Sequence, residues 1–207
     1  KNDIKDVYFV SITVPGNVGG GEIRNFFLLK KWSDLKNFST KLFAISEKGF
    51  ESEVDNVESE LNIRTNIVYK SKRTVFRMLK SVFIDRMPPY MSDFKASGIG
   101  NSFYEDCKKS MPKIVHLEQI HAYYPIRKYI PWLKNNGVKI VLDCHNIEYR
   151  LLEESLGLMS HIKQIGGKLV LRNLKKLEIE AIANADVILC CSELDRDFFI
   201  KYNKNVL

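Results

Sequence analysis

The sequence predicts an α/β protein built on a doubly wound, parallel sheet with a Rossmann-like order of elements. Short apolar runs rich in β-branched and aromatic residues alternate along the chain with segments of helical periodicity. Strands joined through helices make right-handed crossovers, so they form a parallel sheet with helices on both faces. No internal repeat, low-complexity tract or linker interrupts the alternation, which predicts a single domain over residues 1–207.

The apolar runs are the expected strands, and the segments between them are the expected helices. Strands are expected at residues 7–14, 41–46, 63–69, 113–117, 138–143 and 187–191. Helices are expected from Glu22 onward and at residues 51–61, 73–86, 100–110, 129–135, 147–184 and 193–202. Pro88-Pro89 should end the helix at 73–86, because a residue before proline is disfavoured in the helical region. Gly166-Gly167 should interrupt the long helical region.

Size and composition are those of an ordinary globular domain. With 207 residues and a mass of 24.0 kDa, of which 45% are hydrophobic and 28% charged, the chain can bury a substantial core. It contains no apolar stretch of about 18 residues, which a membrane-spanning helix would need. The formal net charge of +7 and the pI near 9.1 favour an anionic partner such as nucleic acid, a membrane surface or a phosphorylated ligand.

The cysteines and the two ends of the chain suggest its context. Cys107, Cys144, Cys190 and Cys191 form no CxxC pair, which argues against a metal site or a disulfide framework and favours a reducing cytoplasm. The chain begins with Lys1 rather than Met and stops at the apolar Val206-Leu207, as if a further strand had just begun. We therefore expect it to be part of a longer protein.

A glycine-rich loop follows the first expected strand. Gly19, Gly20 and Gly21 have no side chains, so their backbone N–H groups can approach a ligand closely, and the following helix start carries partial positive charge. A phosphate would suit this position. The alternative is a tight strand-to-helix turn without a ligand. The loop is not a Walker loop, because no Gly-Lys-Ser/Thr follows it.

A dinucleotide-binding oxidoreductase is an alternative interpretation of the same loop. The spacing Gly16-x-x-Gly19-x-Gly21 resembles some nicotinamide-binding turns, and Glu47 ends the second strand where a ribose-binding acid could lie. Tyr104-x-x-x-Lys108 matches the catalytic pair of short-chain dehydrogenases. That pair precedes the fourth strand here, whereas that family places it after the fifth.

A second polar constellation follows the fifth expected strand. His145, Asn146 and Glu148 place an imidazole, an amide and a carboxylate at the carboxyl edge of the sheet, where ligands of such sheets bind. These groups can orient hydroxyls and phosphate oxygens. Asn146 could instead cap the next helix. His116, inside the fourth strand, is expected to be a packed core residue.

The segment 74–86 has the pattern of a basic amphipathic helix. Its apolar residues share one face, while basic residues lie elsewhere. It could lie on an anionic membrane surface or simply cover the sheet. A basic nucleic-acid-binding module is a further alternative for the whole chain, although no helix-turn-helix, RNA-recognition or zinc-finger pattern is present, so nucleic acid is not the expected partner.

Several loose motifs in a fixed order resemble one enzyme family. They lie at residues 15–24, 86–90, 113–119, 143–148 and 183–192, the last being Ala-Asn-Ala-Asp-Val-Ile-Leu-Cys-Cys-Ser. Together they resemble the N-terminal domain of family 4 glycosyltransferases, a retaining group with the two-domain GT-B fold that builds bacterial lipid-linked glycans, capsules and exopolysaccharides. The chain departs from that pattern by an extra glycine in the loop and by Glu118-Gln119 in place of a histidine and an acid.

The resemblance implies a role for each motif. The chain would be the acceptor-side half of a GT-B enzyme that transfers a sugar from a nucleotide-sugar to a glycan or lipid-linked acceptor, with no metal or other cofactor. The nucleotide-binding half would follow Leu207, so this chain alone should be inactive. His145 would be catalytic, and the donor phosphate or the acceptor would contact Gly19, Gly20, Gly21 and Arg24. The acceptor cleft would comprise Gln119, His121, Asn146 and Glu148, and Ser192 would lie at the interdomain face. The expected location is the cytoplasm, peripheral to the inner face of the membrane.

Overall fold

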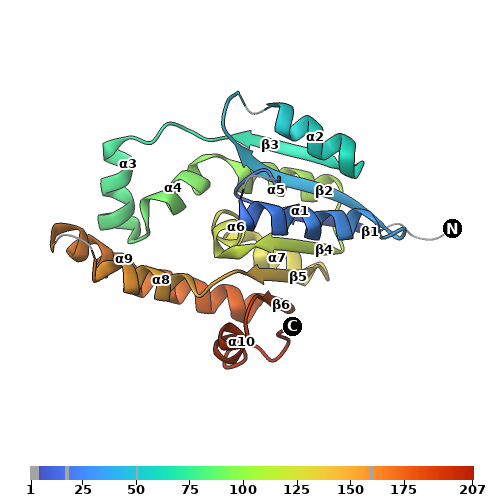
Figure 1. Ribbon diagram of the computed structural model, residues 1–207. Coiled ribbons are helices and arrows are strands. Elements are labelled where there is room, and N and C mark those ends of the chain that lie inside the picture. The colour runs from blue at the N-terminus through green and yellow to red at the C-terminus, as the bar shows by residue number, and fades with distance from the viewer. Residues whose placement is uncertain (1–4, 17–18, 50, 159–160) are drawn as a thin grey trace.

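The computed structural model describes residues 5–16, 19–49, 51–158 and 161–207. Its centre is a 6-stranded sheet with the order β3-β2-β1-β4-β5-β6, drawn in Figure 1. Every neighbouring pair of strands is parallel. The chain winds outward from β1 in one direction and then returns to start again at β4. This is the doubly wound arrangement, and it confirms the predicted fold class.

All the expected strands are present, with small changes at their ends. They are β1 (Lys5–Val10), β2 (Phe38–Ser46), β3 (Arg64–Tyr69), β4 (Ile114–Glu118), β5 (Lys139–Cys144) and β6 (Val187–Cys190). The first strand was expected to continue to Val14, but it ends at Val10. Beyond that point the Ser11 side chain turns to the carboxylate of Glu118 on β4.

The helices include two short ones that the sequence did not predict, α4 and α6. In chain order the helical elements are α1 (Gly20–Ser33), α2 (Glu51–Leu61), α3 (Val75–Lys80), the π-helix η1 (Ser81–Asp85), α4 (Pro89–Ala96), α5 (Ile99–Lys109), α6 (Gln119–Ile126), the 3₁₀ turn η2 (Arg127–Tyr129), α7 (Ile130–Asn135), α8 (Glu148–Leu156), α9 (His161–Asn184) and α10 (Glu193–Phe199). Among the described residues, no helix is long and apolar enough to cross a bilayer.

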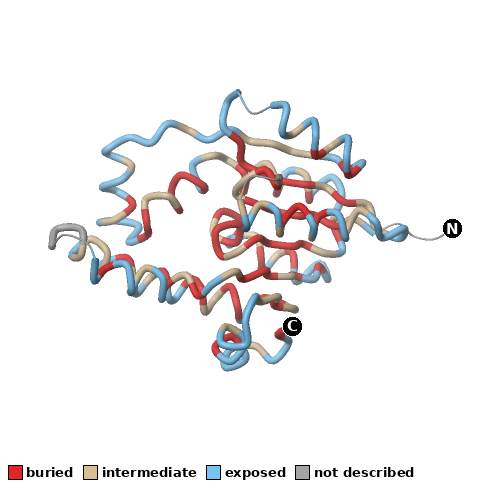
Figure 2. The backbone as a smooth tube through the Cα atoms, viewed as in Figure 1, coloured by how far each residue is buried: buried red, intermediate tan, exposed pale blue. Residues whose placement is uncertain are grey.

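Both faces of the sheet are covered. Successive residues of a strand point to opposite faces, so Phe9 packs with α1 and α2, while its neighbours Tyr8 and Val10 pack into a larger core with α5, α6 and α9. This explains why the strands read as nearly continuous apolar runs rather than as alternating ones. The buried segments of Figure 2 follow the strands and the inner sides of these helices.

The long helical region does not break where the glycines suggested. Gly166 and Gly167 lie inside α9, and the interruption comes earlier, between the end of α8 at Leu156 and the start of α9. The glycines are used for close packing: a Cβ on Gly167 would collide with the Leu156 side chain, and one on Gly166 would lie 3.6 Å from Val82. Tertiary contact thus outweighs the weak helix propensity of glycine.

Within the expected helix at 73–86, only residues 75–85 are helical, and they do not cover the sheet. None of the residues of α3 is buried, and in η1 only Ser81 is. Ser81 anchors the turn, because its hydroxyl donates a hydrogen bond to the Met87 carbonyl at 2.8 Å and accepts one from Ser92 at 2.6 Å. The helical segment ends at Arg86, which has a left-handed backbone with φ of 50°.

The last residues pair with the edge of the sheet. Val206 forms a parallel bridge with Ile188 of β6, and the Leu207 N–H donates a hydrogen bond to the Ile188 carbonyl at 2.8 Å. The expectation that Val206-Leu207 begins a strand agrees with this pairing.

Two glycine-to-alanine changes should have opposite effects on stability. A Cβ on Gly100 of α5 would collide with the carbonyl oxygen of Pro125 on α6, whereas Gly166 has room for one. We expect Gly100→Ala to lower the free energy of unfolding by about 1–3 kcal/mol through overpacking. Gly166→Ala should leave it unchanged or raise it by up to about 1 kcal/mol through helix propensity. Urea unfolding of both variants measures this, and equal midpoints would show that the contact between α5 and α6 is wrongly placed.

Candidate functional site

The predicted polar residues gather at the carboxyl edge of the central strands. The register pairs Glu118 of β4 with Asp143 of β5, so the ends of these strands lie side by side. The loop after β1 enters the same edge, because β1 pairs with β4. The chain reverses its winding between β1 and β4, and such a switch point is where open parallel sheets bind ligands. In Figure 1 this edge faces the left of the view.

The side chain of His145 is hydrogen-bonded to Asp143, which forms a buried ion pair with Arg24. Nε2 of His145 lies 3.2 Å from Oδ2 of Asp143, a carboxylate with no exposed surface. Arg24 of α1 binds the same carboxylate through two nitrogens, at 3.1 Å and 2.6 Å. Burial alone would raise the pKa of Asp143, but the hydrogen bonds from His145 and Arg24 lower it below its ordinary value. Asp143 is therefore an ionised anchor.

The geometry defines which ring nitrogen of His145 is available. Since ionised Asp143 can only accept a hydrogen bond, Nε2 donates to it, which leaves Nδ1 as the ring nitrogen that is available to a ligand. Nδ1 faces the glycine loop, because a Cβ built on Gly21 would lie 3.6 Å from it. The structure thus brings His145 and the glycine loop to the same edge, as predicted.

A second carboxyl group lies at the same edge. Glu118 is 5% exposed, and it accepts hydrogen bonds from the Ser11 hydroxyl and from the Ile12 N–H. Burial raises the pKa of Glu118, an effect that these donors and the nearby Asn25 amide only partly oppose. The Asn25 amide itself is buried and makes no hydrogen bond of ordinary geometry.

These groups line an open hollow, named here the His145 hollow. Its volume is about 330 Å³, and its lining residues are Ile12, Thr13, Gly19, Gly21, Glu22, Glu118, Gln119 and His145. The start of α1 forms one wall. Gly19 is the N-cap residue of that helix and has no side chain to satisfy the free N–H groups of its first turn. A helix start of this kind attracts anions.

A neighbouring cluster contains three of the residues predicted for the acceptor cleft. Gln119 lines the His145 hollow, and its side-chain oxygen accepts a hydrogen bond from Nδ1 of His121. Nε2 of His121 lies 3.6 Å from a carboxylate oxygen of Glu148. Burial lowers the pKa of His121 to about 4 and raises that of Glu148 to about 7. The imidazole is therefore neutral at pH 7, so its contact with Glu148 is not an ion pair.

A buried carboxylate from a distant helix holds the loop that carries these residues. Glu178 of α9 accepts hydrogen bonds from the N–H groups of Glu148 at 2.8 Å and Tyr149 at 3.2 Å, at the start of α8. Burial raises the pKa of Glu178 to about 7. The loop from His145 to Glu148 is thus fixed at one end by Asp143 and at the other by Glu178.

The remaining predicted residues lie farther out. Gly20 and Asn146 are exposed at the rim of the same edge. Ser192 is also exposed and caps α10, because its hydroxyl oxygen accepts the Asp195 N–H at 3.1 Å. His116 is a packed core residue, as predicted: it stacks on Phe9 and accepts the Trp32 indole N–H at 3.1 Å.

The catalytic pair and the ribose-binding acid of the oxidoreductase interpretation do not lie at the His145 hollow, although Gly19 and Gly21 do. Tyr104 stacks on Tyr129 at a ring distance of 4.4 Å, and Lys108 pairs with Glu105 on the surface of α5. Glu47 follows β2 and pairs with Lys70. Among the described residues, no group of His, Cys, Asp or Glu side chains is placed to hold a metal ion.

Sequence reasoning missed Asp143, Glu118 and Ser11 as site residues. The alternation of side chains along a strand could have indicated Asp143. Residues two apart point to the same side, and Asp143 precedes His145 by two. Nothing local could reveal that Ser11 bonds Glu118, because the two are separated by 107 positions in the chain.

No protein-family model matches the sequence, and no curated protein sequence matches it significantly. Solved structures do resemble it. The UDP-GlcNAc 2-epimerase of Neisseria meningitidis bound to UDP-GlcNAc matches with a TM-score of 0.55 and 8% identity, over 98% of this chain and 46% of the epimerase. UGT71G1 of Medicago truncatula, complexed with UDP-glucose, matches with a TM-score of 0.58 and 14% identity, over 97% of this chain and 49% of UGT71G1. HepE of Anabaena, in complex with UDP and glucose, matches with a TM-score of 0.55 and 13% identity, over 98% of this chain and 43% of HepE.

These likenesses establish the fold. The chain has a Rossmann-like fold of the kind that forms one half of the GT-B architecture. It spans less than half the length of each of these proteins.

The buried carboxyl of Glu148 should leave a signature in the pH dependence of stability. Between pH 4.5 and about 7 the unfolded chain releases this proton while the folded chain retains it. Stability therefore falls as the pH rises through this window. We expect Glu148→Gln to flatten the slope, with a gain on the order of 2 kcal/mol at neutral pH relative to pH 4.5. Urea unfolding across the window measures it. Glu153→Gln, on the exposed side of the same helix, is the control, and parallel curves for Glu148→Gln and wild type would contradict the burial.

Proposed function

We propose that this chain is the acceptor-side half of a retaining, nucleotide-sugar-dependent glycosyltransferase. One observation carries the proposal: the imidazole of His145, oriented by Asp143, faces the glycine loop across the His145 hollow. In a half GT-B fold this places a polar group and a helix start together at the ligand-binding edge. The retaining outcome and the N-terminal position rest on the sequence resemblance.

The two sides of the hollow would have different tasks. The free N–H groups at the start of α1 would bind phosphate oxygens of the donor, with which the partial charge of the helix start is compatible. Arg24 has two nitrogens on Asp143, but a third of its side chain is exposed, so the guanidinium can also contact an anionic ligand. Nδ1 of His145 would accept a hydrogen bond from the reacting hydroxyl and so align it. Asp143 would stabilise any positive charge that develops on the ring.

The acceptor cleft suits hydroxyl groups rather than anions. The Gln119 amide lines the His145 hollow, and the pKa of Glu148 is raised to about 7, so the cleft presents hydrogen-bonding groups with little fixed charge. His121 is neutral and lies behind Gln119, which it binds through Nδ1. Asn146 is exposed at the rim, where it can contact the acceptor farther from the reacting atom. A sugar residue carries several hydroxyls that donate and accept hydrogen bonds, and groups that are both donors and acceptors match it. We propose a glycan or lipid-linked glycan as acceptor.

A second candidate is epimerisation of a nucleotide-sugar. It is favoured by the resemblance to a UDP-GlcNAc 2-epimerase and by Glu118, whose buried carboxyl lines the same hollow as His145. Two titratable groups facing one ligand could remove and return a proton. Product analysis separates the candidates: an epimerase converts the nucleotide-sugar without an acceptor, whereas a transferase requires one.

Replacing His145 should abolish most transfer in the full-length enzyme without unfolding it. Loss of one well-placed polar contact to the transition state typically costs about 2.7–4 kcal/mol, so we expect His145→Ala to lower kcat about 10²–10³-fold. The control is Lys139→Ala, an exposed residue at the opposite end of the same strand, which should retain activity. The melting temperature is measured on the same preparations. A destabilised His145→Ala variant with normal specific activity would show that the histidine only packs.

The chain by itself should bind nucleotide-sugars weakly and transfer none. In the proposed enzyme the donor lies between two halves, and this chain supplies one of them. Calorimetry with UDP-sugars on the isolated chain tests this. Binding at low micromolar affinity or better, or measurable transfer, would show that the donor site is complete within these residues.

A further inference from the structure

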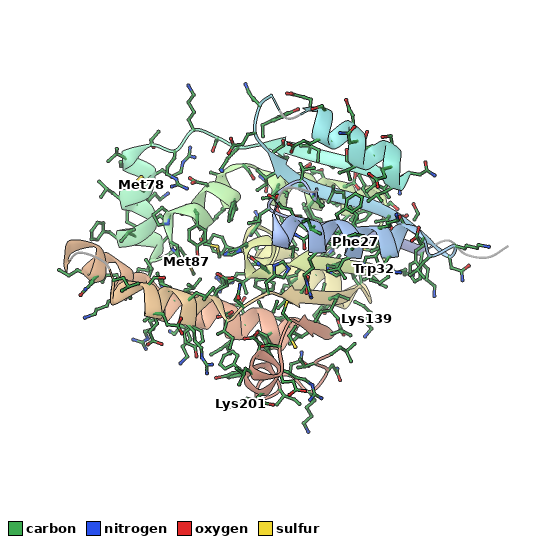
Figure 3. All side chains as sticks on the ribbon, viewed as in Figure 1. Phe27, Trp32, Met78, Met87, Lys139 and Lys201 are labelled. Atoms are coloured by element: carbon green, nitrogen blue, oxygen red, sulfur yellow. The ribbon has the colours of Figure 1, made fainter. Side chains whose placement is uncertain are left out.

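We infer that the surface formed by α3 and η1 docks on an anionic phospholipid bilayer. We name it the α3 surface and define it by its exposed apolar residues Val75, Phe76, Met78, Leu79, Phe83 and Ile84. Figure 2 shows this segment largely in the colour of exposed residues, projecting from the carboxyl edge of the sheet. Met78, labelled in Figure 3, lies at the outer left of that view.

The exposure of these side chains is unusual for a helix that follows a strand. Phe76 is 77% exposed and Ile84 71%, and none of the residues of α3 is buried. Exposed large apolar side chains gathered on one element mark a surface for interaction, whereas single ones do not. The neighbouring α9 extends this character, because it contacts η1 and also exposes Ile165 and Leu169.

The charges around the α3 surface identify the partner. The segment 70–86 carries one acid, Asp85, against the bases Lys70, Lys72, Arg73, Arg77, Lys80 and Arg86. Arg73 and Arg77 lie 2.5 Å and 3.9 Å from the buried carboxylate of Asp93, which fixes the segment to α4. Lys72, Lys80 and Arg86 are exposed. Apolar side chains flanked by bases match the two components of an anionic bilayer, its acyl boundary and its headgroups.

A second copy of this chain is a poor occupant of the same surface. Two such segments brought face to face would place like charges together, and the chain as a whole has a formal net charge of +7. The helix is also too short to insert across a bilayer, since α3 and η1 together cover only residues 75–85. It would lie in the interfacial plane.

Docking through this surface would orient the candidate site toward the membrane. The link is α4, which follows η1 directly and carries Tyr90, whose ring centroid lies 5.4 Å from that of His121. In Figure 1, α3 projects beyond the carboxyl edge of the sheet, and the residues that line the His145 hollow follow strands at that edge. An acceptor attached to a lipid could therefore reach the hollow. This orientation, unlike the docking itself, rests on the proposed function.

Vesicle sedimentation of the full-length protein tests the inference. We expect binding to vesicles of phosphatidylglycerol and phosphatidylcholine at low salt, loss of binding as salt is added, and little binding to pure phosphatidylcholine. Phe76→Ser with Phe83→Ser should weaken binding at least tenfold. Lys72→Gln with Lys80→Gln should weaken it about fivefold for each side chain removed, since each contributes about 1 kcal/mol.

Matched controls use exposed residues elsewhere. Leu194→Ser with Phe27→Ser removes apolar surface from α10 and α1, and Lys201→Gln with Lys204→Gln removes two bases. Both should bind nearly as wild type does. Equal binding by the α3-surface variants and these controls would overturn the inference, as would a concentration-dependent dimer that Phe76→Ser dissolves.

A fluorescent side chain on the α3 surface adds a local measurement. The emission of a Phe76→Trp variant should shift to the blue on anionic vesicles, relative to the wild-type protein measured in the same way, because the indole would leave water for the bilayer interface. An emission spectrum that vesicles leave unchanged would show that position 76 does not enter the bilayer, and the inference would fail.

An assay of sugar transfer to a water-soluble acceptor separates the test of membrane docking from the test of the proposed function. If the α3-surface variants fail to bind vesicles but transfer normally to the soluble acceptor, docking and catalysis are separate properties, as we infer. If vesicle binding by the wild-type protein is absent and transfer is present, the docking inference is wrong and the proposed function stands. Vesicle binding without any transfer would leave docking in place and contradict the glycosyltransferase.

Discussion

The carboxylate of Asp143 is the group on which the arrangement of the site depends. It lies at the end of a central strand with no exposed surface, where an uncompensated charge would be very costly. Arg24 and His145 provide the compensation from two different elements, the first helix and the loop after β5. One buried charge therefore fixes the glycine-loop helix against the strand that carries the histidine, and it sets the tautomer of that histidine as well.

The carboxyl edge also carries three buried carboxyl groups, whose burial is energetically unfavourable in the ionised form. The pKa values of Glu118, Glu148 and Glu178 are all raised, with burial as the largest cause, while most of the core between the strands and helices is apolar. Burying a carboxyl lowers stability near neutral pH unless it remains protonated. A concentration of such groups at the edge where parallel sheets bind ligands is typical of functional sites. Here they form a connected set with Gln119 and His121, which extends from the His145 hollow to the start of α8.

The same edge carries a surface of the opposite character. Between β3 and α4 the chain leaves the sheet, exposes apolar side chains on α3 and η1, and returns through Pro88-Pro89. Asp93 holds two arginines of this excursion, and Ser81 holds its turn, so the segment is anchored although its apolar side is uncovered. In the proposed enzyme, a polar hollow and an exposed apolar surface at one edge would suit an acceptor whose polar reacting group is attached to an apolar carrier.

The sequence alone determined the alternation of strands and helices and the polar residues that follow each central strand. These follow from periodicity and from residue types within short windows, which act on the backbone locally. Two short helices escaped prediction because α6 includes Pro125 and begins at Gln119 with a left-handed backbone, and α4 has only 8 residues. Their buried faces, not their propensities, stabilise them. Only the tertiary structure decided that the helix at 73–86 would stay uncovered, that Gly166 and Gly167 would pack inside α9, and that Arg24 would meet Asp143 across 119 positions. Such outcomes depend on which distant surfaces come into contact, and no local window contains that information.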